Sequence, residues 1–209
     1  MIKKNKEIMQ FKITLNDSKP KIWRRIQVPA DYTFFDLYCA IEDAMGWGGG
    51  HLHAFYVEGK GSKDRMVIEF PNPEAGDSTY IKTHDERKEK IADYFGKICK
   101  QCVYCYDMGD SWDHTVIFEH IVPMETRVRY PRCVAGENAR PPDDCGGVWG
   151  YGDLQKIIQN PRHPEHVEMM EWLGIDDPKD FDPSRFDLSE VGFSNPRRRL
   201  KEWNEGFRI

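Results

Sequence analysis

A short acidic segment near the middle of the chain carries the residues best suited to chemistry. Asp107 and Asp110 stand three positions apart, and His114 follows four positions later. Two carboxylates and an imidazole can bind a metal ion or move a proton. In a tight turn the same aspartates would instead cap backbone amides, and the histidine would be a satisfied, partly buried side chain. The second interpretation is favoured because a hairpin turn needs Asp and Gly in any case.

A second polar group lies in residues 131–147, which are rich in proline, glycine and aspartate. Cys133 and Cys145 are candidate zinc ligands, with His114 or Asp144 completing the set, although their separation is long for a zinc knuckle. A disulfide or a structural role in anchoring the loop are the alternatives. The sequence therefore assigns no cofactor, and zinc stays an open option. The candidate binding residues are Trp112, Tyr130, Cys133, Asp143, Asp144, Cys145 and Tyr151.

A glycine run at residues 48–50 precedes His51 and His53. The run leads into a strand and lacks the Lys-Ser/Thr ending of a phosphate-binding loop, so it indicates a helix stop followed by a turn. Alternation places both histidines on one strand face, and we expect one of them to be exposed near the acidic turn.

The elements that position these residues begin with two strands, a helix and a third strand. Residues 9–15 and 22–28 alternate apolar and polar side chains, as half-buried strands do. Thr33 and Asp36 have the spacing of a capping box at the start of a helix. Residues 52–57 form the next predicted strand.

The middle of the chain continues as a strand-rich region. We expect strands at 65–70, 102–106 and 112–119, a loop at 71–77, a short helix at 86–95 and an extension of the sheet at 127–130. Residues 107–111 then form the turn between two paired strands. Residues 131–147 are predicted to be one long loop, a feature that is often functional.

The C-terminal part, residues 150–209, is predicted to be mainly helical, with helices at 151–159, 164–173 and 196–203. The simplest packing is an α+β fold, a β-rich roll of antiparallel strands with C-terminal helices. A length of 209 residues fits a single domain over 1–209.

The overall charge and hydropathy exclude some classes of protein. The net charge of −5 argues against a general nucleic-acid binder, and the best local basic patch is at residues 197–201. No apolar run approaches the roughly 18 residues of a membrane-spanning helix, and no secretory signal is evident. We expect a cytoplasmic protein with reduced cysteines and no membrane partner.

The motifs resemble one known family, the plasmid pRiA4b ORF-3-like proteins. The resemblance rests on residues 22–25, 47–55, 106–114, and 130–147 with the following Gly-Tyr at 150–151. Met108 replaces the phenylalanine that is usual in the family. The resemblance implies an α+β roll-like fold and an unknown biochemical function, and some relatives carry a transposon-resolvase label.

Three functions stay open at this point. The leading one is a binding or accessory module that uses the long loop and the acidic turn as its recognition surface, with a protein or small-molecule partner in preference to nucleic acid. The second is a metal-dependent hydrolytic enzyme using Asp107, Asp110 and His114. The third is a DNA-linked role in mobile elements through residues 197–201.

Overall fold

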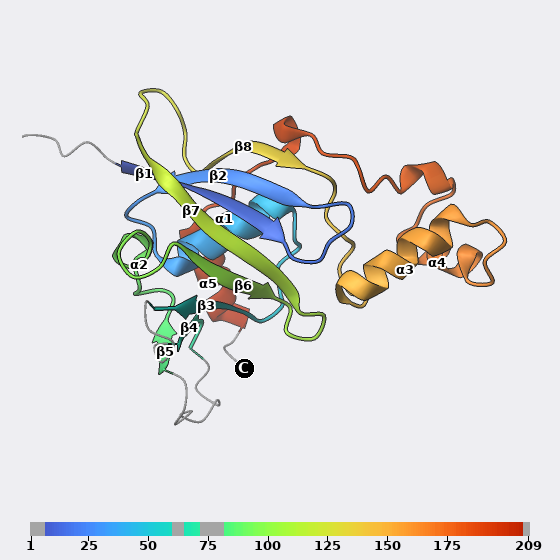
Figure 1. Ribbon diagram of the computed structural model, residues 1–209, viewed down its shortest axis with the longest axis horizontal. Helices are drawn as coiled ribbons and strands as arrows, with labels where there is room; N and C mark the ends of the chain where they lie inside the picture. Colours follow the sequence, from blue (N-terminus) through green and yellow to red (C-terminus); the bar gives the residue numbers. More distant parts are fainter. Residues whose placement is uncertain (1–6, 60–64, 72–81, 207–209) are drawn as a thin grey trace, which may run out of the picture.

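The sheet is the central element of the protein (Figure 1). The computed structural model describes residues 7–59, 65–71 and 82–206. Within them eight strands form one open sheet in the order β5-β4-β3-β6-β7-β1-β2-β8, antiparallel throughout except for the parallel pair β4 and β5. The strands are β1 (Glu7–Leu15), β2 (Trp23–Pro29), β3 (His53–Glu58), β4 (Arg65–Glu69), β5 (Lys82–Asp85), β6 (Gln101–Tyr106), β7 (Trp112–Pro123) and β8 (Arg132–Glu137).

Helix α1 (Phe34–Met45) supplies much of the core that covers the sheet. Its first turn has the predicted capping box: Thr33 Oγ1 accepts from the Asp36 amide, and the Asp36 carboxylate accepts from the Thr33 amide. Gly46 ends the helix with a left-handed φ of 92°, a conformation that glycine adopts without steric cost. The predicted order of the first four elements, two strands followed by a helix and a third strand, is confirmed.

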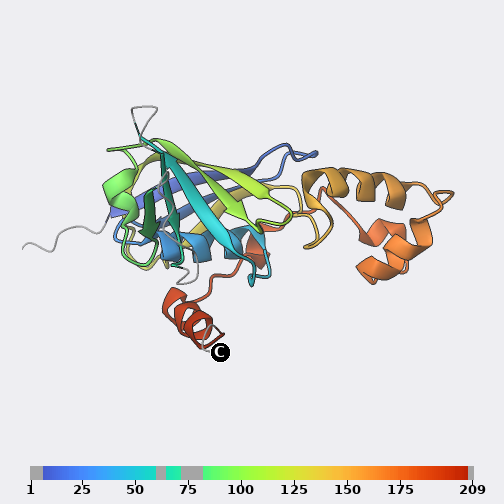
Figure 2. The same cartoon turned by 90° about the horizontal axis from the view of Figure 1, so that it is seen from below.

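The other helices lie outside this layer. Figure 2 shows α1 against one face of the sheet, α5 beyond α1, and α3 with α4 extending from one end of the sheet. None of the helices in the described ranges is long and apolar enough to cross a membrane. The helices are α2 (Ile91–Tyr94), α3 (Gly147–Gln159), α4 (His166–Leu173) and α5 (Pro196–Gly206), with short 3₁₀ turns η1 (Pro178–Asp180) and η2 (Leu188–Glu190).

Pairing of β6 with β7 sets the direction of the side chains near the acidic turn. Tyr104 lies opposite His114, and Tyr106 lies opposite Trp112. Trp112, His114 and Val116 are all fully buried, which confirms the face that alternation predicts for them. The predicted β-rich α+β fold is therefore correct, and the sheet is open with helices on one side and at one end.

Two parts of the predicted element map are wrong. Residues 127–130 do not extend the sheet; strand β8 instead lies within the segment predicted to be a long loop, where it pairs with β2. That partner is distant in the sequence, so local turn composition gave no sign of the pairing.

The predicted helix at 86–95 shrinks to one turn, α2, and is preceded by the unpredicted strand β5. The side chain of Glu86 enters the core and lies 2.9 Å from His53 Nε2, so this contact overrides local helix propensity. Most of the predicted loop at 71–77 lies outside the described residues.

The C-terminal segment passes over strand β8, the last strand of the sheet. The Ala139 amide donates to the Pro183 carbonyl at 2.9 Å. The ring of Phe186 lies so close to Gly136 that a Cβ there would meet it at 2.6 Å. The Arg24 guanidinium stacks on the Phe186 ring, 4.0 Å from the ring centre.

Candidate functional site

Three loops that are distant in the sequence meet at one end of the sheet (Figure 1). They are the connection from α1 to β3, the turn between β6 and β7, and the connection from β8 to α3. The Asp107 amide donates to the Leu52 carbonyl at 3.0 Å, and the Gly146 amide donates to Asp110 Oδ2 at 3.2 Å. The acidic turn is therefore held between the other two loops.

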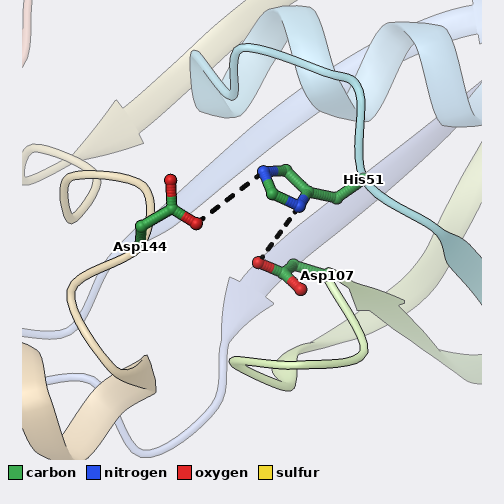
Figure 3. A group of neighbouring side chains, drawn as sticks. All are labelled: His51, Asp107 and Asp144. Carbon is green, nitrogen blue, oxygen red and sulfur yellow. Dashed lines mark ion pairs between the residues drawn. The ribbon is translucent and has the colours of Figure 1, made fainter.

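His51 lies between two aspartates that come from the other two loops (Figure 3). Its Nδ1 is 3.4 Å from Asp107 Oδ2, and its Nε2 is 4.0 Å from Asp144 Oδ1. One ligand atom from each residue lies within 4.8 Å of the others, the only such group of potential metal ligands among the described residues. The side chains of His51, Asp107 and Asp144 are 35%, 14% and 72% exposed, so the cluster opens to solvent.

The backbone at both aspartates is in the left-handed region. Asp107 has a φ of 53° and Asp144 a φ of 58°, and Ser111 at the far end of the turn has a φ of 55°. Non-glycine residues are uncommon there, and aspartate is among the more tolerant types. In the turn, Asp107 Oδ1 accepts from the Gly109 amide at 2.9 Å, which leaves Oδ2 to face His51.

Close backbone packing explains the glycines in the first turn of α3, where the third loop ends. A Cβ on Gly147 would stand 2.5 Å from the Asp110 carbonyl oxygen, and one on Gly150 would overlap the Cys145 carbonyl. Only glycine permits this approach. Glycine at position 147 therefore allows the backbone after the third loop to pack directly against the acidic turn.

An aromatic layer supports the cluster from below. Tyr106 lies under His51, with the two rings perpendicular and their centroids 5.6 Å apart. Trp47 packs on Tyr106 and on Trp112 at 5.0 and 5.3 Å. The Arg140 guanidinium covers the Trp47 ring at 5.3 Å. This packing fixes the position and orientation of the loops that carry the charged groups.

His114 belongs to this aromatic layer and not to the exposed cluster. Its Nε2 accepts from Trp47 Nε1, and its Nδ1 lies at the same distance of 3.3 Å from the Tyr104 carbonyl. Both nitrogens are therefore satisfied inside the core by a neutral imidazole. Burial lowers the pKa of His114 to about 4. The structure brings Asp107 to His51, not to His114, and Asp110 is used to bind the Gly146 amide.

Several buried polar atoms beneath the cluster have no partner among the described residues. They include the Tyr106 hydroxyl, the Trp112 indole N–H, Glu42 Oε2 and Asp143 Oδ1. Burial, followed by the negative charges of Glu42, Asp143 and Asp107, raises the pKa of Tyr106. Buried polar atoms of this kind usually bind water, an ion or a ligand.

Glu42 was not among the residues predicted for the site. It lies on the core-facing side of α1, where its Oε1 accepts from the Tyr104 hydroxyl at 2.7 Å. Burial raises its pKa to about 8. Its spacing in the sequence could have identified Glu42 as a buried residue. It follows Tyr38 by four residues and precedes Met45 by three, so it lies on the same apolar face of the helix.

The cysteine candidates do not join the metal-ligand group. All six cysteines are free. Cys133 Sγ lies 3.3 Å from the Ala135 carbonyl, and burial raises the pKa of Cys145 to about 12. Both thiols therefore have the surroundings of structural residues.

The remaining candidate binding residues lie in three places. Trp112 and Asp143 lie beneath and beside the cluster. Tyr151 is buried on the inner face of α3. Tyr130 precedes β8 at the opposite end of β7, where its hydroxyl accepts from the Glu125 amide at 3.4 Å.

Comparisons with known proteins agree with this arrangement of motifs. The model of the plasmid pRiA4b ORF-3-like protein family matches residues 7–190. An uncharacterized protein, y4hQ of Sinorhizobium fredii (strain NBRC 101917 / NGR234), is 28% identical over 184 residues, which is 88% of each chain. The crystal structure of the protein of unknown function MM3350 from Methanosarcina mazei Go1 has a TM-score of 0.79 and 37% identity, covering 90% of this chain and 99% of that one. The chain belongs to the pRiA4b ORF-3-like family, and these relatives carry no assigned function.

Proposed function

We propose that this member of the pRiA4b ORF-3-like family is a binding module whose recognition surface holds a divalent cation at His51, Asp107 and Asp144. The observation that carries the proposal is the approach of three ligand atoms, one from each loop, to within 4.8 Å. The pairing of one imidazole nitrogen with carboxylate oxygens suits a first-row transition ion better than a hard ion such as Mg²⁺.

Tyr106 is a further polar side chain in contact with the cluster. Its side chain is buried directly against the His51 ring, yet the hydroxyl has no partner among the described residues. Buried hydroxyls of this kind usually bind water, an ion or a ligand. A bound cation would replace the two ion pairs of His51. Their loss would cost little stability, because exposed pairs contribute at most about 1 kcal/mol to the free energy of unfolding.

The exposure of the cluster favours binding over hydrolysis. Asp144 is mostly exposed, and electrostatic stabilisation of a transition state by a charge that faces bulk water is weak. The residues expected for the enzymatic alternative are also divided between different tasks, since His114 is a neutral core residue and Asp110 caps a backbone amide.

The DNA-linked alternative receives less support. Within residues 197–201, Arg199 lies against α1, 3.3 Å from Asp43, and Arg198 is paired with Glu202 at 2.8 Å. These contacts reduce the positive charge available to a phosphate backbone. The proposal retains the expectations of one domain over 1–209, a cytoplasmic location, and a protein or small-molecule partner.

Titration of the untagged protein with Zn²⁺, Mn²⁺ and Mg²⁺ by isothermal calorimetry tests the proposal. We expect one ion per chain, with Zn²⁺ or Mn²⁺ bound more tightly than Mg²⁺. His51→Gln and Asp107→Asn should each weaken binding by about tenfold or more, since each removes a direct ligand.

The matched controls are His120→Gln and Asp93→Asn, which remove an exposed histidine and an exposed aspartate elsewhere. These variants should bind as the unmodified protein does. Absence of saturable binding, or equal losses in the control variants, would overturn the proposal.

A further inference from the structure

A second surface lies on the other side of the acidic turn. It is a groove of about 1160 Å³ between the β1–β2 turn, the start of β7 and helix α3. The views in Figures 1 and 2 both place α3 beside the β1–β2 turn. Gln155 Nε2 of α3 donates to the Lys19 carbonyl of that turn at 2.8 Å, which fixes the width of the groove.

The groove is positively charged although the whole chain is negative. Four lysines line it, Lys12, Lys19, Lys21 and Lys156, against two aspartates, Asp17 and Asp153. Lys156 is paired with Asp153 at 2.7 Å. The other three lysines have no ion pair within the described part of the chain. Their charge is therefore available to an anionic partner in a protein with a net charge of −5.

An exposed tryptophan stands on the wall of this groove. Trp149 is 83% exposed, the largest fraction among the large apolar side chains described. Helix α3 buries Tyr151, Leu154 and Ile158 on its inner face, so Trp149 stands where an amphipathic helix normally carries a polar residue. A tryptophan beside a polar rim is a common anchor in protein interfaces.

We infer that this groove binds an acidic peptide segment of a partner protein, with Trp149 packed against an apolar side chain of the peptide. The lysines would pair with its carboxylates, and the groove also offers the amide side chain of Gln159 for the peptide backbone.

A peptide fits this groove better than a nucleic acid. Asp17 and Asp153 lie among the lysines, and their carboxylates would repel the continuous line of charge of a phosphate backbone. A peptide can instead place neutral residues opposite these aspartates. The inference does not depend on cation binding at His51, because no residue of that cluster lines the groove.

Fluorescence anisotropy with a labelled peptide, Glu-Asp-Glu-Phe-Asp-Glu-Asp, tests the inference on the full chain. We expect saturable binding that weakens as salt is added. A peptide with Gln and Asn in place of the acids should bind about tenfold more weakly. Trp149→Ala and the double variant Lys19→Glu with Lys21→Glu should each reduce affinity for the acidic peptide by a similar factor.

Matched controls separate the groove from general surface effects. Trp172→Ala removes an exposed tryptophan of α4, and Lys97→Glu reverses an exposed lysine after α2. Neither should change the affinity. The inference is overturned if the acidic peptide does not bind, if the neutral peptide binds equally well, or if labelled oligothymidylate binds more tightly than the acidic peptide. Circular dichroism of each variant confirms that a loss of binding is not a loss of fold.

Discussion

Two histidines separated by one residue face carboxylates in opposite surroundings. His53 Nε2 lies 2.9 Å from Glu86 Oε2, and the two side chains are 1% and 0% exposed. The His53 ring also stacks on Tyr38, with ring centroids 3.6 Å apart and planes within 4°. His51 lies 3.4 Å from Asp107 and remains about one third exposed.

The difference in burial gives the two pairs different uses. Removing one partner of a buried pair leaves the other without compensation inside the core, so such a pair holds the fold. An exposed pair is screened by water and contributes little to stability. It can therefore release its partner when a cation or another ligand arrives. The comparison predicts large stability effects at His53 and Glu86, and small stability effects with large binding effects at His51.

The strongest test of this contrast is Glu86→Ala. The substitution leaves His53 buried without its carboxylate, so we expect the free energy of unfolding to fall by about 3–5 kcal/mol. Urea denaturation followed by tryptophan fluorescence measures it. A loss below about 1 kcal/mol would show that the buried pair is dispensable and would remove the basis of the comparison.

A second test uses the buried carboxyl of Glu42. Its pKa is about 8 in the folded protein, above the ordinary 4.5, so the folded state retains a proton that the unfolded state releases. The contribution of Glu42 to stability should be full below pH 4.5 and fall by on the order of 4 kcal/mol as the pH rises to 8. Glu42→Gln keeps an acceptor for Tyr104 and should be more stable than the unmodified protein at pH 8. Equal melting temperatures at pH 8 would contradict this account.

His114 should produce the opposite slope in acid. Its pKa is about 4 in the folded protein, below the ordinary 6.5, so the unfolded state binds a proton first as the pH falls. The contribution is present above pH 6.5 and lost toward pH 4, by on the order of 3 kcal/mol. The unfolding free energy of His114→Gln should change less than that of the unmodified protein over this range. His120→Gln, which removes an exposed histidine, should leave the slope unchanged.

The smallest stability effect should come from His51→Gln. Because the pair is exposed, we expect the free energy of unfolding to change by less than about 0.5 kcal/mol. Zn²⁺ should nevertheless raise the melting temperature of the unmodified protein and not that of the variant, since only a ligand bound to the folded state stabilises it. A large destabilisation of this variant without metal would place His51 in the same class as His53.

Local patterns predicted the supporting layer of the site better than the site itself. Period-two alternation correctly placed Trp112 and His114 on the buried face of β7. The capping box at Thr33 correctly marked the start of α1. The cluster of His51, Asp107 and Asp144 depends on the order of strands in the sheet and on the path of a loop from β8 to α3. These contacts join segments far apart in the chain, so no short stretch of the sequence predicts them.

The same limit explains the missed strands. Strand β8 depends on a partner more than a hundred residues earlier, since Gln27 lies opposite Arg132. Strand β5 pairs in parallel with β4, an arrangement without a tight turn and so without a turn signal in the sequence. Strands with a local alternating pattern were found even where their partners are distant, and β5 and β8, which lack a local signal, were not.

The passage of the C-terminal segment over β8 has a consequence for assembly. An outermost strand has unpaired backbone groups that can recruit a strand from another molecule. Here the Ala139 amide beyond the end of β8 is already bonded to Pro183, and the Phe186 ring lies against Gly136. The C-terminal segment therefore covers part of the β8 margin and leaves less of it open to a strand from another molecule. Damage to this cover would first appear as concentration-dependent aggregation.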